Sequence, residues 1–106
     1  MEAWVYILRC ADGSYYTGLA RGPDLARRMA EHEAGEGADY TRRRLPVELV
    51  FSQHFARIED AIEAERRIKG WSRAKKEALI AGRFDLLPDL SARGFRPAAD
   101  DADGDD

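Results

Sequence analysis

Polar side chains that can do chemistry occur at five positions where the local pattern predicts largely apolar faces: Tyr6, Tyr16, Arg28, His32 and Glu65. A phenol or an imidazole can hold or transfer a proton, a guanidinium can neutralise an anion, and a carboxylate can hold a metal ion. The first four lie close together in the sequence, and the glutamate lies in a later predicted helix. We interpret them as two halves of one candidate active site, and we expect the fold to bring them into one cleft.

A predicted β-hairpin carries the two tyrosines, and the length of its loop decides whether they share a face. β-Forming residues on both sides of an Asp-Gly pair are a strong hairpin signal. A loop of Asp12 and Gly13 alone would place Tyr6 and Tyr16 on opposite faces. A three-residue loop that also includes Ala11, with the glycine left-handed, places both on one face, where glycine leaves space beside Tyr6. We predict this loop, with strands Trp4 to Cys10 and Ser14 to Leu19 and with Tyr6 paired to Gly18 and Leu8 to Tyr16. On the hairpin alone, two ordinary strand tyrosines are the alternative.

A helix predicted from Pro23 to Ala34 carries the arginine and the histidine. At 100° per residue, Arg28 and His32 share one arc with the apolar residues Leu25 and Met29, whereas Arg27 points the opposite way. A guanidinium on an apolar stripe needs an anionic partner. The alternative is that Arg28 lies at the edge of the stripe with its charged end in water.

A second helix, predicted from Ile58 to Lys69, carries the glutamate. Glu65 falls near the middle of its apolar arc, and a carboxylate there is costly unless a cation or a metal compensates it. We favour a metal, and a salt bridge to Arg28 is the alternative. The strand before this helix is predicted from Val47 to Ala56. Its core face is predicted to be Val47, Leu49, Phe51 and Phe55, with Gln53 as an exception and His54 on the other face.

The remaining segments are a loop, a short basic helix and a C-terminal region. Residues 35–46 are predicted to be a loop, because glycines break the preceding helix and Pro46 precedes the next strand. Ser72 can cap a helix from Arg73 to Ile80, from which Lys75 and Lys76 project. The apolar residues that follow are predicted to cover the body: Phe84, Leu86, Leu87, Leu90 and Phe95. We predict one domain over residues 1–96 and a disordered acidic tail over 97–106.

Composition and charge indicate an ordinary globular domain with a basic surface. The chain has 106 residues, of which 44% are hydrophobic, and no apolar run long enough to span a membrane. It has no zinc-ligand spacing, and its single cysteine, Cys10, fits a reduced core residue; we expect a cytoplasmic protein. The net charge of −3 reflects five aspartates in the last seven residues. Without them, the chain has 17 basic and 15 acidic residues. The basic residues form two clusters: Arg42, Arg43 and Arg44, and then Arg66, Arg67, Lys69, Arg73, Lys75 and Lys76. A polyanion is the partner that such patches favour.

Taken together, these residues resemble the GIY-YIG nuclease superfamily. The two signatures occur as Trp4-Val5-Tyr6 and Tyr16-Thr17-Gly18, Arg28 and His32 match the helix signature, and Glu65 matches the metal-binding glutamate. The resemblance covers residues 3–81 and is strongest to a small stand-alone bacterial group similar to the catalytic domain of Slx-type structure-specific endonucleases. Two further stretches look like that group: residues 37–42 and residues 72–80.

The resemblance implies an α+β fold with a three-stranded antiparallel sheet flanked by helices, in the order β-β-α-β-α-α. It implies an endonuclease of DNA rather than RNA that acts in repair or recombination with one Mg²⁺ or Mn²⁺ on Glu65. The implied catalytic residues are Tyr6, Tyr16, Arg28, His32 and Glu65. The nucleic acid is expected to contact Tyr40, Arg42, Arg43, Arg44, Lys69, Arg73, Lys75 and Lys76. The chain has no asparagine, a residue that many relatives carry near the phosphate; the alternatives are that Lys75 or Lys76 takes its place or that the activity is weak. The alternatives are a non-catalytic nucleic-acid-binding module and an adapter that binds a protein partner in a repair complex.

Overall fold

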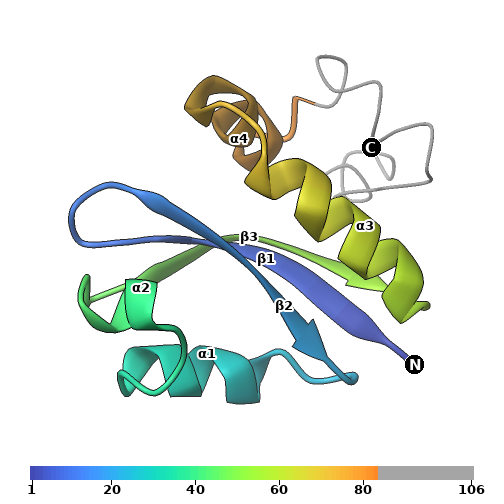
Figure 1. Ribbon diagram of the computed structural model, residues 1–106, viewed down its shortest axis with the longest axis horizontal. Coiled ribbons are helices and arrows are strands. Elements are labelled where there is room, and N and C mark those ends of the chain that lie inside the picture. Colours follow the sequence, from blue (N-terminus) through green and yellow to red (C-terminus); the bar gives the residue numbers. More distant parts are fainter. Residues whose placement is uncertain (84–106) are drawn as a thin grey trace, which may run out of the picture.

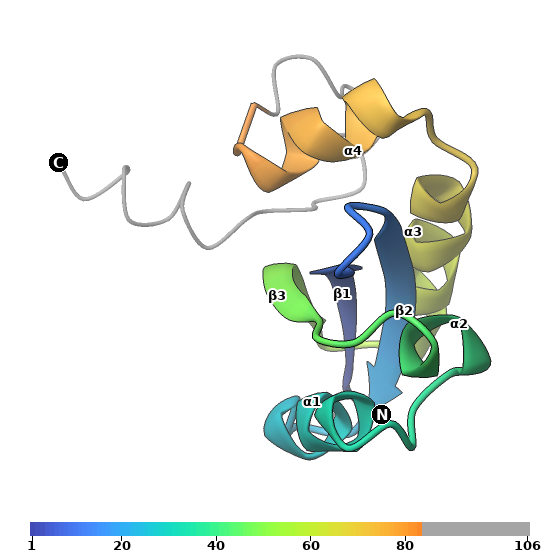
Figure 2. The same cartoon turned by 90° about the vertical axis from the view of Figure 1, so that its left-hand side faces the viewer.

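Residues 1–83, the part of the chain that the computed structural model describes, form a three-stranded antiparallel sheet between two layers of helices (Figure 1). The strand order is β2-β1-β3. Helices α1 and α2 lie on one face of the sheet, and α3 and α4 lie on the other (Figures 1 and 2). The predicted fold class is confirmed. The elements are β1 (Ala3–Arg9), β2 (Tyr15–Arg21), α1 (Ala26–Glu33), α2 (Asp39–Arg42), β3 (Glu48–Phe55), α3 (Ile58–Lys69) and α4 (Arg73–Ile80).

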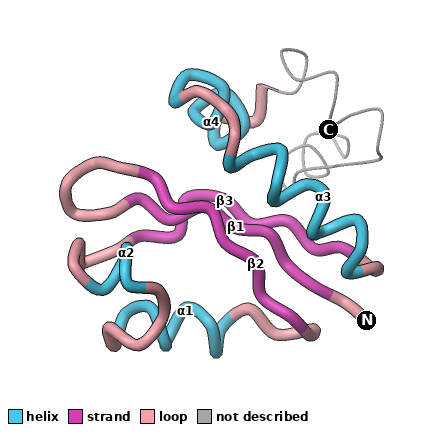
Figure 3. Tube along the Cα trace, viewed as in Figure 1, coloured by secondary structure: helices cyan, strands magenta, loops and turns pink. Residues whose placement is uncertain are grey.

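A loop joins β1 to β2 (Figure 3), and the pairing of Cys10 with Ser14 leaves the three predicted residues, Ala11 to Gly13, at its tip. The Cys10 amide donates to the Ser14 carbonyl at 2.8 Å, and Gly13 has a φ of +86°, which an L side chain rarely adopts. Tyr6 therefore lies opposite Gly18, and Leu8 lies opposite Tyr16. Both tyrosines occupy the same face of the sheet, as expected.

Alternating residues of the central strand β1 belong to two separate hydrophobic clusters, one on each face of the sheet. Val5 and Ile7 belong to the cluster under α3 and α4, which includes Ala64, Ile68 and Leu79. Tyr6 and Leu8 belong to the second cluster, against which Leu25 and Met29 of the α1 segment pack. Because β1 is covered on both faces, every residue from Val5 to Leu8 is buried, and each large side chain contributes about 1.5–3 kcal/mol by burial. The sheet thus separates α1 from α3.

Two predictions around α1 were wrong in detail. The helix begins at Ala26 rather than Pro23, because Asp24 Oδ1 accepts a hydrogen bond from the Ala26 amide at 2.9 Å and so supports the helix start from outside. Residues 35–46 are not entirely a loop, since α2 forms one helical turn within them.

The predicted core face of β3 was also wrong at one end. A bulge interrupts the pairing with β1, so that Ile7 lies opposite Phe51 while Leu8 lies opposite Leu49. The extra residue, Val50, packs on the α3-side cluster in place of Leu49, which is 43% exposed.

Helices α3 and α4 have the predicted bounds. The Ser72 hydroxyl caps α4 by accepting from the Lys75 amide at 3.3 Å. Lys75 projects as predicted, whereas Lys76 is half-buried and Ala74, which was expected to pack, is exposed. No helix among residues 1–83 is long and apolar enough to cross a membrane. The predicted cover from Phe84 to Phe95 and the acidic tail lie outside the described residues, so they stay predictions.

Candidate active site

Tyr6 is fully buried on β1, and its position depends on the glycine opposite it. A Cβ on Gly18 would come within 2.5 Å of the Tyr6 ring and hydroxyl. The ring therefore lies directly over the glycine, and the small residue of the second signature determines where the hydroxyl of the first signature lies.

The Tyr6 hydroxyl lies between the two polar groups of α1. Its oxygen is 2.7 Å from His32 Nε2 and 3.2 Å from Arg28 Nε. On the far side of the imidazole, Nδ1 is 2.9 Å from the Thr41 hydroxyl, which donates to the Ala38 carbonyl at 3.0 Å. A continuous hydrogen-bonded chain therefore runs from Arg28 through Tyr6 and His32 to α2.

The chemistry of the end groups determines the direction of every hydrogen bond in this chain. A guanidinium only donates and a carbonyl only accepts. Because Thr41 donates its proton to Ala38, its oxygen accepts from Nδ1–H of His32. In the neutral imidazole Nε2 is then unprotonated and accepts from the Tyr6 hydroxyl, whose oxygen accepts from Arg28.

The electrostatics of these groups agree with this direction. Burial raises the pKa of Tyr6 to about 12, despite the opposing effect of the hydrogen bond from Arg28. Burial, with the nearby Arg28 guanidinium, lowers the pKa of His32 below its ordinary value. At neutral pH the pair is a protonated phenol and a neutral imidazole, so Tyr6 is suited to hold its neighbours in place and not to act as a base.

Two residues that support His32 were not assigned a role from the sequence. Thr41 is fully buried on α2 and fixes the imidazole tautomer. Gly37 is needed because a Cβ at this position would overlap the His32 ring. From the sequence, Gly37 was recognised only as a residue that ends a helix. Thr41 lies in a segment predicted to be a loop, where no periodic pattern indicates a buried residue.

Tyr16 lies beside this chain without belonging to it. Its ring centroid is 5.5 Å from that of His32 and 6.5 Å from that of Tyr6. Tyr40 stacks on it at 6.0 Å, and the Arg44 guanidinium lies 3.8 Å from the centre of the Tyr40 ring. Within residues 1–83, no side chain or backbone group forms a hydrogen bond with the Tyr16 hydroxyl, so this phenol is available to a ligand.

The predicted orientation of the α1 arginines is confirmed. Arg27 is 86% exposed, whereas Arg28 is largely buried and donates to Glu31 at 2.9 Å. The anionic partner of Arg28 is therefore Glu31 on its own helix, three residues later, and not Glu65.

Glu65 lies across the sheet from these groups. It is 16% exposed on α3 and pairs with the half-exposed Lys69 at 2.8 Å. Because α1 and α3 cover opposite faces of the sheet, Glu65 and Arg28 can meet a common ligand only around the edge strand β2, and the predicted shared cleft stays a prediction. The two sides come near each other at β2, where Lys69 of α3 interacts electrostatically with the Tyr16 phenol. The pKa of Lys69 is raised chiefly by its hydrogen bond with Glu65, and Tyr16 adds a smaller contribution.

Comparison with known proteins places this arrangement in a family. A sequence model described as the GIY-YIG catalytic domain matches residues 2–78. The chain belongs to the GIY-YIG family. A UPF0213 protein of Natronomonas pharaonis is 53% identical over 80 residues, which are 76% of this chain and 92% of that protein. One from Streptococcus pneumoniae is 45% identical, over 79% of this chain and 83% of its own length.

Two solved structures are also similar. The solution structure of a UPF0213 protein from Bacillus halodurans is 46% identical with a TM-score of 0.50, and covers 76% of this chain and 84% of its own. A second solution structure, of a protein from E. faecalis, is 36% identical with a TM-score of 0.54, and covers 81% and 88%. The predicted membership is confirmed, and the relatives are UPF0213 proteins, whose names state no activity.

In this GIY-YIG domain a basic side chain approaches the start of β2 from each face: Arg73 from one and Arg44, through Tyr40, from the other. Tyr15 and Tyr16 are consecutive and point to opposite sides. Arg73 of α4 lies 4.5 Å from the centre of the Tyr15 ring, and Tyr40 stacks on Tyr16. The other residues expected to contact nucleic acid differ in exposure. Arg42, Arg43 and Lys75 are exposed, Lys76 is half-buried, and Lys69 pairs with Glu65.

GIY-YIG nucleases generally use a divalent metal, and the donor groups here fit a weakly held, hydrated ion. Among residues 1–83, no three His, Cys, Asp or Glu side chains gather into a preformed metal cage. Glu65 offers one largely buried carboxylate whose present partner is a single ammonium group. One carboxylate together with substrate phosphate and water is a common ligand set for Mg²⁺.

Proposed function

We propose that this protein is a metal-dependent endonuclease that hydrolyses phosphodiester bonds, with DNA as the substrate rather than RNA. The observation that carries the proposal is the buried chain from Arg28 to Thr41 next to a Tyr16 hydroxyl that no described group engages. Such a chain holds a cation at a fixed position beside a free phenol, which is what attack on a phosphate requires.

Arg28 is the residue that binds the scissile phosphate. Its Nε is engaged by Tyr6 and its Nη1 by Glu31, which leaves Nη2 for a phosphate oxygen. Because both engaged nitrogens are fixed by neighbours, the guanidinium does not need to reorganise as charge develops in the transition state. Tyr6 and His32 act as positioning residues for Arg28.

Tyr16 is the tyrosine that holds the attacking water. Tyr6 is excluded from this role by its engaged hydroxyl and its pKa of about 12. When bound to Glu65 and to the substrate, one Mg²⁺ or Mn²⁺ would polarise a phosphate oxygen and stabilise the leaving oxygen. Lys69, which neutralises Glu65 in the free protein, then remains beside the substrate as an additional cation.

The two basic groups on opposite faces of β2 favour a substrate that is larger than one strand. Arg73 with Tyr15 on one face and Arg44 with Tyr40 on the other can each contact a separate strand or duplex arm. We therefore propose branched or flapped DNA, and a role in repair or recombination.

The test is a cleavage assay on labelled junctions, flaps, single strands and their RNA counterparts in Mg²⁺, Mn²⁺ or EDTA. Glu65→Gln protein purified in parallel controls for contaminating nucleases. We expect metal-dependent cutting of a branched DNA by the wild type alone. Tight binding without cutting in any metal would contradict the proposal and favour the non-catalytic binding module.

A further inference from the structure

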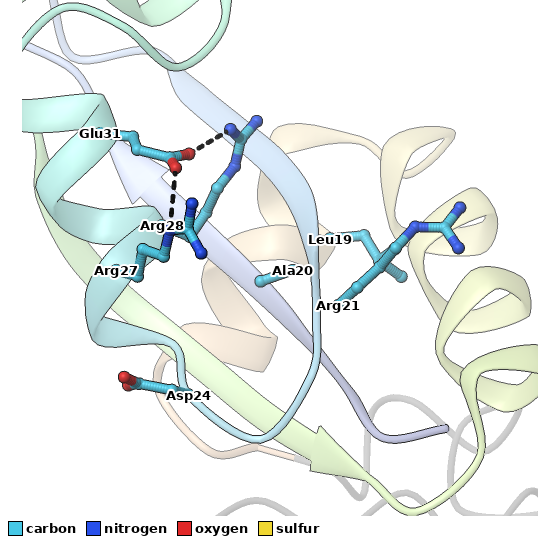
Figure 4. Close-up of a pocket in the computed structure, with 7 residues that line it drawn as sticks. All are labelled: Leu19, Ala20, Arg21, Asp24, Arg27, Arg28 and Glu31. Atoms are coloured by element: carbon cyan, nitrogen blue, oxygen red, sulfur yellow. Dashed lines mark hydrogen bonds and ion pairs between the residues drawn. The ribbon is translucent and has the colours of Figure 1, made fainter.

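A hollow of about 300 Å³ lies where the outer strand β2 passes α1 (Figure 4). It is lined by Leu19, Ala20, Arg21, Asp24, Arg27, Arg28 and Glu31. The side chains of Leu19 and Arg21 project from the side of β2 that faces away from α1, while that of Ala20 faces α1. The hollow therefore extends across the strand. It does not include Tyr6, Tyr16 or Glu65, and it shares only Arg28 with the proposed catalytic residues.

The charges around the hollow favour an anion. Three guanidinium groups and two carboxylates line the hollow. Both carboxylates are engaged: Asp24 accepts from the Ala26 amide, and Glu31 pairs with Arg28 and, at 3.6 Å, with Arg27. Arg21 forms no ion pair or hydrogen bond with any residue from 1 to 83. An exposed guanidinium without a partner, across the edge strand from two others that line the same hollow, is suited to a phosphate.

The backbone of β2 adds donors to the same place. The Cys10 amide bonds to the Ser14 carbonyl and the Gly22 amide to the Glu2 carbonyl, so the even-numbered residues of β2 are the ones bonded to β1. Backbone amides point to alternate sides along a strand, so the amides of Leu19 and Arg21 point away from β1, toward the outer edge of the sheet. Within the described residues β2 is one of the two edge strands of the sheet, and such an edge is a suitable place for an anion.

We propose that this hollow binds a second phosphate of the nucleic-acid strand, next to the one that is cut, and that Arg21 and Arg27 are its ligands. This inference rests on the proposed function. Arg28 touches both places and so would fix the spacing between the two phosphates. The hollow would therefore determine which phosphodiester of a strand reaches Tyr16.

The test measures binding of a labelled DNA flap in EDTA, so that no cleavage is needed. Arg21→Gln and Arg27→Gln should each weaken binding by roughly tenfold at low salt, and each should reduce the slope of log affinity against log salt by about 0.9. Arg57→Gln is the matched control, because Arg57 is 71% exposed, has only a loose pair with Glu59 and lies outside the hollow. It removes the same charge and should leave the slope unchanged.

A second arm replaces single phosphates of the flap by uncharged methylphosphonates, one position at a time. At one position beside the cut, the modification should weaken wild-type binding and have no further effect on Arg21→Gln. If the wild type binds and cuts while both arginine variants match Arg57→Gln, the inference is overturned and the proposed function stands. A wild type that neither binds nor cuts would overturn both.

Discussion

Tyr6 and Glu65 are both polar groups in largely buried positions, but their surroundings differ. Tyr6 makes two hydrogen bonds inside a chain that continues through His32 to Thr41. Glu65 has one partner, the ammonium of Lys69, which is half-exposed and lies on the same helix. A fully satisfied buried network is rigid and costly to disturb, whereas a half-exposed ion pair contributes little to stability and exchanges easily.

In the proposed nuclease this difference would give the two sides of β2 separate tasks. The α1 side has its geometry fixed before any ligand arrives, which suits groups that must meet a transition state. The α3 side offers a carboxylate whose counterion can be replaced, which suits a metal that arrives with the substrate.

The largest expected effect is on cleavage by Glu65→Gln. Loss of the carboxylate should reduce the cleavage rate at least about a thousandfold, since metal and transition-state stabilisation disappear together. The unfolding free energy in EDTA should change by less than about 1 kcal/mol, because only a half-exposed ion pair is lost. Cleavage and thermal melting measured together check this, with Glu59→Gln on the exposed side of α3 as the control. A variant that melts far below the wild type would show that Glu65 is structural.

Next in size is the effect of a single added methyl group beside Tyr6. Gly18→Ala should lower the unfolding free energy by about 1–3 kcal/mol, because its Cβ would overlap the Tyr6 ring. Gly70→Ala at the end of α3 is the control, since its Cβ would meet no atom closer than 3.7 Å. Urea denaturation compares the two variants. Equal stabilities would mean that the α1 side is not tightly fixed.

The two tyrosines should differ when each loses its hydroxyl. Tyr6→Phe leaves His32 Nε2 buried without a donor and should cost about 1–3 kcal/mol of stability. Tyr16→Phe should change stability by less than about 0.5 kcal/mol while still reducing cleavage, because the described structure gives its hydroxyl no partner. Denaturation curves and cleavage rates of both variants provide the check. The division fails if Tyr16→Phe is the less stable of the two.

The smallest effect is the pH dependence of stability that His32 introduces. Burial lowers the pKa of His32 in the folded protein, so the unfolded chain binds a proton more readily. The unfolding free energy should therefore fall as the pH drops through the unfolded value of about 6.5 towards the folded-state pKa, with a slope of at most about 1.4 kcal/mol per pH unit. Denaturation at a series of pH values checks this, and His32→Gln should lose that part of the slope. A wild type that gains stability between pH 7 and 5.5 would contradict the neutral imidazole.

Local signals were enough to predict the hairpin register and the two later helices. The Asp-Gly turn and the need for both tyrosines on one face decided the loop length, and the glycine at position 70 with Ser72 after it defined where α3 ends and α4 begins. Each of these decisions depends on neighbours within a few residues, where turn and capping chemistry act.

Features that depend on pairing between distant segments escaped prediction. The bulge at Val50 arises from the fit between β3 and β1, so the alternating pattern of β3 alone gave the wrong core face for Leu49. The contact of Thr41 with His32 joins two elements across a loop and has no periodic signal. The partner of Glu65 could have been predicted from the sequence, because Lys69 lies four residues later on the same helix, which is a favourable spacing for an ion pair.

The chain from Arg28 to Ala38 has a consequence for how protons can move in this site. One end can only give a proton and the other end can only receive one, so the hydroxyl groups between them cannot turn round together. At neutral pH every acceptor atom in this row already receives a hydrogen bond from its neighbour. In the proposed reaction, Tyr6 and His32 would therefore hold Arg28 in place beside a step that releases a proton, without passing that proton inward.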